Sequence, residues 1–343
     1  MNLSAGAPLE PARYRVGRRS MLLADPDRSG RLLGVDIWYP TFATSGEPST
    51  YELFPGVSFD AAGALHEPPA GPGTFPLIVF SHGRTGVRFA YSLVCEALAA
   101  RGAVVVSSDH PGDVLTDWLL GTHTDDRTNE VNRVADAHLV LRAMLHGDDN
   151  IPVDVLNSID HARVALAGHS YGAYTALATA AGARGVEAHD VVRAAVVFQP
   201  YTRIMSDSLL GRVPVPVLLV VSELDRVTPP DTDAERPWSL LRGSPVWRLD
   251  VHGAGHQAVS DIALYAELAE HIEGLPQIVI DYLASGAADA AGPAGSSWRD
   301  RMRLQVEAAW AFLDEVMDLG DAEDRPAALE RLASSSAVTL RRR

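Results

Sequence analysis

Short apolar runs recur along the chain between amphipathic segments, and this alternation constrains the fold more than any other feature. The apolar runs lie at 76–80, 103–109, 163–170, 194–198, 215–222 and 246–251. Strands buried on both faces are continuously apolar, and helices connect them when they run parallel. Such helices are predicted at 88–101, 130–146 and 171–182. The sequence therefore predicts an α/β domain with a mostly parallel, doubly wound sheet and helices on both faces.

The part of the chain before these runs is predicted from its turns and composition. Residues 14–39 contain two strand patterns joined by a turn, which indicates an antiparallel hairpin at the start of a single domain spanning 13–320. Residues 41–76 are dense in Pro, Gly, Ser and Thr. We expect this segment to wrap over the surface without a regular element of any length.

Two internal segments and the two ends are expected to lie outside the repeating elements. The polar insertion 113–130 is predicted at the rim of a pocket, and 286–296 is predicted to be a loop. Residues 1–12 are predicted to form an amino-terminal tail. Residues 321–343 are charged and serine-rich, and a solvated, frayed carboxy-terminal tail is predicted there.

The charge balance excludes several classes of function. Because 29 basic residues face 44 acidic ones, the net charge is −15 and no broad basic face is available for nucleic acid. Every basic residue is arginine, so a lysine Schiff base, a pyridoxal phosphate anchor and a Walker A loop are excluded. The one cysteine, Cys95, cannot form an internal disulfide and is predicted to pack in the core.

Export and membrane signals are not predicted. The pair Arg18 and Arg19 is followed by Asp25 and Asp27 before any apolar segment of an export signal has formed. The apolar runs are also much shorter than the roughly 20 residues of a membrane helix. We therefore expect a cytoplasmic protein without stable membrane insertion, and the sequence leaves its oligomeric state open.

The strongest chemical motif is GHSYG at 168–172, where an apolar strand ends and an alanine-rich helix begins. Such a turn exposes a serine hydroxyl, and Gly168 and Gly172 are expected because side chains there would collide with neighbouring backbone. The start of the following helix also favours developing negative charge. The motif predicts Ser170 as a nucleophile, with His169 in a structural role.

A serine hydroxyl needs a base, and the base needs a carboxylate that orients it. His256 lies in a glycine-bracketed loop after a predicted strand and is the predicted base, whereas the nearby His252 is predicted to be structural. Asp225 follows the strand at 215–222 and is the predicted acid. Glu223, two residues nearer the strand, remains the alternative.

Acyl transfer also needs two N–H donors for the oxyanion, and loss of one donor costs about 3 to 4 kcal/mol of transition-state stabilisation. The backbone amide of Tyr171 is the first predicted donor. The amide of Arg84 is the second, with Gly83 allowing close approach of the substrate carbonyl. His82 is predicted to be a hydrogen-bonded scaffold residue.

Other sites are less specific. Trp118, Phe198 and Tyr201 are candidate walls of a substrate pocket, with core packing as the alternative. Neither a metal nor a nucleotide cofactor is predicted. Asp109 and His110 lack the spacing of a metal site, and no glycine-rich dinucleotide fingerprint follows the first strands.

The run from Phe75 to Gly112, together with GHSYGAYTA and GAGHQAVSDI, resembles the plasma-type platelet-activating factor acetylhydrolase family. The opening hairpin is similar to that of bacterial relatives described as dienelactone-hydrolase-like esterases. The resemblance covers roughly residues 13–285. It implies an α/β-hydrolase fold, no cofactor, and hydrolysis of short or oxidised acyl esters.

One position departs from the animal members of that family. Their triad acid closes the strand after the nucleophile helix, and the matching residue here is Gln199, which cannot stabilise an imidazolium by charge. Asp225 lies where most other α/β-hydrolases carry the acid. This departure weakens the expectation of a phospholipid substrate more than the expectation of ester hydrolysis.

The resulting hypothesis is a cofactor-independent serine hydrolase that cleaves small-molecule, short-chain carboxylic esters. Thioesters, amides and polyesters are alternative substrates, because the motif reports acyl chemistry and not the leaving group. A binding protein of the same fold without turnover is the alternative of another class.

Overall fold

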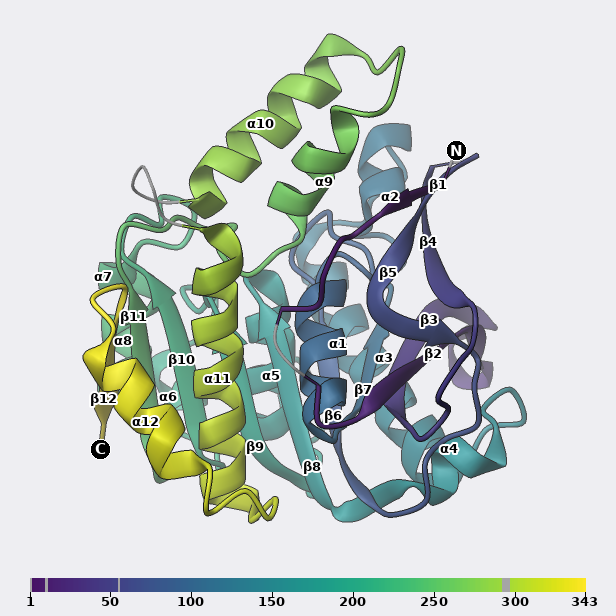
Figure 1. Cartoon of the computed structure of the whole chain (residues 1–343). Coiled ribbons are helices and arrows are strands. Elements are labelled where there is room, and N and C mark those ends of the chain that lie inside the picture. The colour runs from purple at the N-terminus through teal and green to yellow at the C-terminus, as the bar shows by residue number, and fades with distance from the viewer. Residues whose placement is uncertain (1, 10–11, 55, 292–296) are drawn as a thin grey trace.

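The computed structural model describes residues 2–9, 12–54, 56–291 and 297–343 (Figure 1). Across these residues the strands join one 12-stranded sheet. In chain order they are β1 (Asn2–Ser4), β2 (Arg15–Asp25), β3 (Arg31–Thr41), β4 (Pro48–Phe54), β5 (Val57–His66), β6 (Phe75–Ser81), β7 (Val104–Ser108), β8 (Ile159–His169), β9 (Val192–Phe198), β10 (Val217–Ser222), β11 (Val246–Val251) and β12 (Val338–Arg342).

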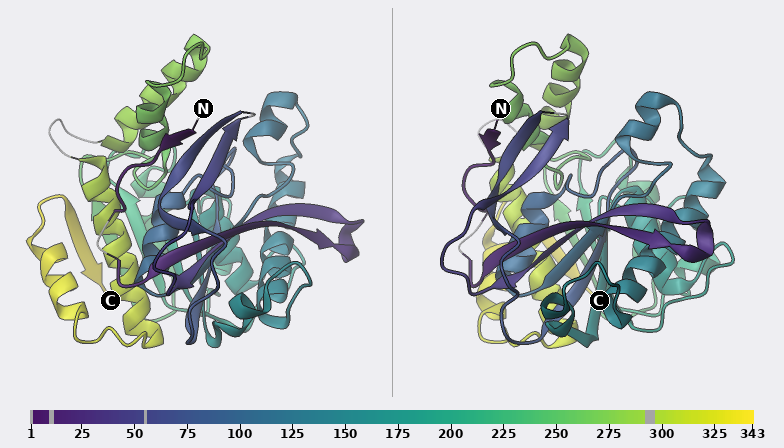
Figure 2. Two further views of the ribbon diagram at one scale, coloured as in Figure 1. Left: turned by 45° about the vertical axis from the view of Figure 1, so that its right-hand side comes forward. Right: turned by 90° about the vertical axis from the view of Figure 1, so that its right-hand side faces the viewer.

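The centre of the sheet is parallel, in the order β7-β6-β8-β9-β10-β11. The antiparallel pair β2 and β3 joins one side through β3 and β7, and its long ribbon extends past the body of the protein (Figure 2). The predicted hairpin and the predicted mostly parallel sheet are both confirmed. The carboxyl ends of the parallel strands meet at one edge, where this class of sheet binds ligands.

Helices cover both faces of the sheet, as predicted. They are α1 (Ser92–Arg101), α2 (Leu115–Leu120), α3 (Asp126–His146), α4 (Val153–Asn157), α5 (Tyr171–Ala181), α6 (Asp207–Leu210), α7 (Pro230–Asp233), α8 (Glu235–Leu240), α9 (Ile262–Ala269), α10 (Gln277–Ala291), α11 (Trp298–Met317) and α12 (Arg325–Ser334). None of those formed by the described residues is long and apolar enough to cross a membrane.

Successive apolar side chains along each central strand contribute alternately to the hydrophobic layers on the two faces of the sheet. In β6, Ile78 and Phe80 belong to the core beneath α1 and α11, whereas Leu77 and Val79 belong to the core beneath α3 and α5. Successive strand residues point to opposite faces, so a run that is apolar at every position must be covered on both. Cys95 is fully buried in the first of these layers.

The expectation that 41–76 lacks regular structure is wrong. This segment contains β4 and β5, which pair antiparallel. Tyr51 and Phe59 stack on each other with ring centroids 5.0 Å apart, and both are buried. The segment therefore buries aromatic surface on α1 despite its turn-rich composition.

The two ends are also more ordered than predicted. At the amino-terminal end, β1 pairs with β5, while residues 1, 10 and 11 lie outside the described residues. At the other end, β12 pairs antiparallel with β11, and α12 buries Leu332 against the core. The prediction of a frayed tail at 321–343 is therefore wrong. The charged side chains of this segment face outward from an edge strand, and charge at a sheet edge prevents pairing with other chains.

The two internal segments carry helices. The segment 113–130 contains α2 and the first turn of α3. The predicted loop 286–296 is wrong for its first part, because α10 continues to Ala291, and 292–296 lie outside the described residues. Gly286 lets α10 approach α9 closely, since a Cβ there would lie 2.2 Å from Ile262 Cδ1.

Candidate active site

Ser170 lies on a sharp turn between β8 and α5, with φ +53° and ψ −116°. A non-glycine residue at positive φ is strained, and here the surrounding backbone enforces it. A Cβ on Gly172 would lie 1.9 Å from the carbonyl oxygen of Ser81, and one on Gly168 would lie 2.3 Å from the Gly172 carbonyl oxygen. Both glycines are therefore required by backbone contact.

Ser170, His256 and Asp225 come together from three loops at the carboxyl edge of the sheet. His256 Nε2 lies 2.9 Å from Ser170 Oγ. On the other side of the ring, His256 Nδ1 lies 2.8 Å from Asp225 Oδ2. All three residues are buried. This geometry allows the serine proton to pass to Nε2 while the carboxylate holds the Nδ1 proton.

Asp225 is held as a carboxylate. Burial alone would raise its pKa, but hydrogen bonds from His256 and Thr228 outweigh burial and lower it. Its Oδ1 accepts from the amides of Val227 and Thr228 at 2.8 and 2.7 Å, and its Oδ2 accepts from the Thr228 hydroxyl at 2.7 Å. The rival Glu223 instead accepts from the Gly253 amide.

The loop that carries His256 is anchored on both sides. His169, beside the serine, lies with Nε2 2.8 Å from the His256 carbonyl oxygen. From α10, the Asp289 carbonyl accepts from the Gly255 amide at 2.9 Å, and its carboxylate accepts from the Gln257 amide at 2.7 Å. His252 points away, with Nε2 2.8 Å from Thr339 Oγ1 on β12. The segment expected to be a loop therefore helps to position the base.

Gly83 packs directly against Ser170, since a Cβ there would lie 3.3 Å from Ser170 Cβ. Its own amide donates to Tyr91 Oη at 3.2 Å, and Tyr91 Oη lies 2.7 Å from His169 Nδ1. With Nε2 of His169 donating to a carbonyl, Nδ1 accepts from the tyrosine. One chain of hydrogen bonds thus links the loop after β6 to the serine turn and to the His256 loop.

The two predicted oxyanion donors differ in their surroundings. Tyr171 is the first residue of α5, so its amide has no partner within the helix. Among the described residues, the Arg84 amide donates to none, whereas its side chain pairs with Asp126 and lies over the Tyr171 ring. Neither amide donates a hydrogen bond to a described residue, as an oxyanion donor requires before substrate binds.

The predicted pocket residues fall into two groups. Trp118 and Tyr201 are half-buried near the site: Trp118 stacks on His123 with centroids 4.0 Å apart, and Tyr201 packs edge-to-face on Tyr171. Phe198 is fully buried and packs toward Phe80 in the core. The prediction of Phe198 as a pocket wall is wrong, because β9 directs this side chain inward.

Comparison with known families agrees with this architecture. The family model described as platelet-activating factor acetylhydrolase, isoform II, matches residues 142–328, more than half of the chain. The chain belongs to this family. A chlorophyllase family model also matches residues 62–200.

Individual relatives are distant. A platelet-activating factor acetylhydrolase of Cavia porcellus is 23% identical over 181 residues, which span 43% of this chain and 40% of that protein. A solved ferulic acid esterase from Streptomyces cinnamoneus superposes with a TM-score of 0.69 at 23% identity, covering 92% of this chain and 93% of that chain. The superposition shows that this member of the acetylhydrolase family has the α/β-hydrolase fold.

Gln199, at the position where the animal acetylhydrolases are expected to carry their acid, makes different contacts here. Its Nε2 donates to Ser222 Oγ at 2.9 Å and to Gln305 Oε1 at 3.2 Å. The carboxylate beside His256 is that of Asp225, from the next strand of the sheet.

Sequence reasoning missed several residues that support the site. These are Tyr91, Asp113, Arg133, Thr228 and Asp289. Arg133 could have been found, because it shares a helical face with Ala137, Val140 and Met144 and so belongs to an apolar stripe. Within the described part of the chain, no group of three or more His, Cys, Asp or Glu side chains could hold a metal ion.

Proposed function

We propose that the protein is a serine hydrolase that cleaves short-chain carboxylic esters through Ser170, His256 and Asp225. The observation that carries the proposal is the continuous chain from Ser170 Oγ through both nitrogens of His256 to a buried carboxylate, at 2.9 and 2.8 Å. Family membership and the acetylhydrolase relative support ester cleavage. This constellation of nucleophile, base and orienting acid serves acyl transfer on several folds.

The reaction runs in two halves. Ser170 Oγ attacks the ester carbonyl carbon and gives its proton to His256 Nε2, while Asp225 stabilises the resulting imidazolium. The carbonyl oxygen, now negative, accepts hydrogen bonds from the Tyr171 and Arg84 amides. The intermediate then expels the alcohol, which takes the proton from His256. Water repeats these steps on the acyl-enzyme and releases the acid.

Initial rates on p-nitrophenyl esters from acetate to palmitate test this proposal, with Ser170→Ala as the matched variant. We expect turnover that falls steeply beyond short acyl chains, and a loss of at least about 10⁴-fold in kcat for Ser170→Ala. Wild-type protein that neither turns over any ester nor reacts with a fluorophosphonate would overturn the proposal and favour a binding protein of the same fold.

The leaving group is tested separately. A thioester, an anilide, a soluble polyester and methyl ferulate are compared with the acetate ester by kcat/KM. We expect the oxygen esters of small acids to be preferred. A higher kcat/KM on the thioester or the anilide would replace the ester assignment while retaining the same three residues.

A further inference from the structure

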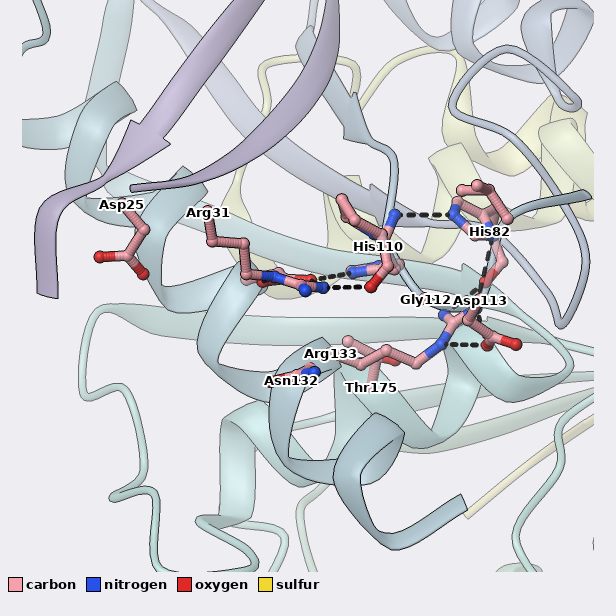
Figure 3. A network of polar contacts seen from close by, with 12 residues as sticks. Asp25, Arg31, His82, His110, Gly112, Asp113, Asn132, Arg133 and Thr175 are labelled. Carbon is pink, nitrogen blue, oxygen red and sulfur yellow. Dashed lines mark hydrogen bonds and ion pairs between the residues drawn. The ribbon is translucent and has the colours of Figure 1, made fainter. Parts of the chain in front are cut away.

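A fully buried arginine lies beneath the loop that follows β6. Arg133, on α3, places Nε and Nη2 at 2.8 and 2.7 Å from Asp113 Oδ2 (Figure 3). Its remaining donors reach backbone: Nη1 donates to the His82 carbonyl at 2.8 Å and Nη2 to the Gly83 carbonyl at 3.1 Å. One side chain therefore holds the two carbonyls that precede the Arg84 amide.

Because the peptide bond is planar, these contacts of Arg133 also fix the direction of the Arg84 N–H. The Gly83 carbonyl and the Arg84 N–H belong to the same peptide, and in a trans peptide these groups point in opposite directions. With the carbonyl held by Arg133 in the interior, the N–H is directed away from Arg133. Gly83 itself packs on Ser170, so the peptide that bears this N–H lies beside the nucleophile.

Asp113 holds the same loop one residue further along. Its backbone carbonyl accepts from the Thr85 amide at 3.1 Å, while its carboxylate binds Arg133. Thr85 has φ +60°, which is a strained conformation for a β-branched residue and persists only where the surroundings enforce it. Arg133 and Asp113 thus fix the peptides on both sides of Arg84.

His82 supplies a second donor to the same carbonyl. His82 Nε2 accepts from the His110 amide at 3.2 Å, so Nδ1 carries the proton and donates to the Gly83 carbonyl at 2.6 Å. Burial, together with the charge of Arg133, lowers the pKa of His82 well below its usual range and keeps the ring neutral. The Gly83 carbonyl is therefore doubly held.

We propose that Arg133 and Asp113 are positioning residues that hold the Arg84 N–H toward the oxyanion formed at Ser170. The proposal rests on the proposed hydrolase function. Arg133 also lies over the Tyr171 ring, 4.7 Å from its centroid, so it contacts Tyr171 as well as the peptide that bears the Arg84 N–H. It acts through the loop and does not touch substrate.

The expected consequence is a loss specific to the transition state. Removing a single oxyanion donor costs about 10²- to 10³-fold in kcat. We expect Arg133→Met to lower kcat about 10²-fold and to change KM by less than about threefold. Arg133→Lys keeps the charge but cannot hold Asp113 and both carbonyls at once, so we expect an intermediate loss.

The test compares kcat/KM for p-nitrophenyl acetate with the inhibition constant of a trifluoromethyl ketone, whose adduct with Ser170 carries an oxyanion. If the proposal holds, kcat/KM falls and the inhibition constant rises by similar factors in Arg133→Lys, Arg133→Met and Asp113→Asn. The control is Arg248→Met, which removes another buried arginine, one that pairs with Glu235 and Asp250 away from the site. It is expected to lower the unfolding temperature and leave both quantities unchanged.

Two outcomes are decisive. Wild type that is inactive on every ester and inert to fluorophosphonate overturns the proposed function itself. Active wild type with ketone affinity unchanged in a folded Arg133 variant overturns only the positioning role. Arg133→Lys is the deciding variant if Arg133→Met does not fold, and circular dichroism on each protein establishes which comparison applies.

Discussion

The two halves of the site are built in opposite ways. Asp225 is held by groups two and three residues away in its own loop, and the base loop by contacts from His169 and α10. The loop after β6, which carries the proposed oxyanion donor Arg84, depends instead on an ion pair between Asp113 and Arg133, both fully buried and 20 residues apart in the chain.

This difference predicts how each half fails. The Asp225 turn has several donors, so losing one leaves the others in place. A buried ion pair that loses one partner leaves an uncompensated charge, which is strongly destabilising. Loss of one donor to Asp225 should therefore have a graded, small effect, whereas loss of either Asp113 or Arg133 should have a larger one.

The largest effect expected on the acid side comes from Asp225→Asn. The amide cannot stabilise the imidazolium and favours the wrong histidine tautomer, so we expect kcat to fall about 10³- to 10⁴-fold with little change in KM. Glu223→Gln is the matched control and should retain wild-type rates, because Glu223 contacts the Gly253 amide. Greater loss in Glu223→Gln than in Asp225→Asn would reassign the acid.

Buried histidines on both sides of the site should also make the stability sensitive to acid. Burial, aided by the Arg133 charge, lowers the pKa of His110 to about 4, and burial also lowers that of His169 to about 3. An unfolded histidine takes up its proton near pH 6.5. Stability is therefore lost as pH falls from about 6.5 toward 4, by about 1.4 kcal/mol per pH unit for each histidine.

Chemical denaturation between pH 7 and 5 measures that slope. His110→Asn should reduce it, and replacement of the half-exposed His252 by Gln should not. An unfolding free energy that is constant over this range would contradict the assignment of both histidines as neutral.

Tyr91→Phe tests whether the two halves communicate. It removes the hydroxyl that joins the Gly83 amide to His169, leaving buried groups without partners. We expect kcat/KM to fall about tenfold. Tyr174→Phe removes another buried tyrosine hydroxyl, one that donates to the Glu130 carbonyl on α3, and is expected to retain the wild-type value; equal losses in the two variants would point to general destabilisation.

The smallest effect is expected for Thr228→Val. The hydroxyl bond to Asp225 is lost, but the backbone amides of Val227 and Thr228 remain. We expect kcat/KM to fall about threefold and the acid limb of the pH–rate profile to change little. A loss above about 10²-fold would show that the acid side is not graded.

Sequence alone predicts the central parallel strands, the opening hairpin and the three residues that meet at Ser170, because each of these has a local pattern. The glycine-flanked serine motif and the glycine-bracketed His256 need only a few neighbouring residues to be recognised. The partners of the long-range supports have no such pattern. The apolar stripe of α3 indicates that Arg133 is buried, but the groups that Arg133 and Asp289 hold come from distant segments and have no local signal.

The contact between Gly172 and the Ser81 carbonyl has a consequence for evolution and engineering. It sets the spacing between the nucleophile turn and the oxyanion strand by backbone against backbone, with no side chain in between. Because no side chain takes part in this contact, exchanging core side chains elsewhere for others of similar volume leaves this spacing unchanged. The turn at Ser170 therefore keeps this spacing when other residues change, so libraries that vary the segment 113–130 around Trp118 can be large while the two glycines stay constant.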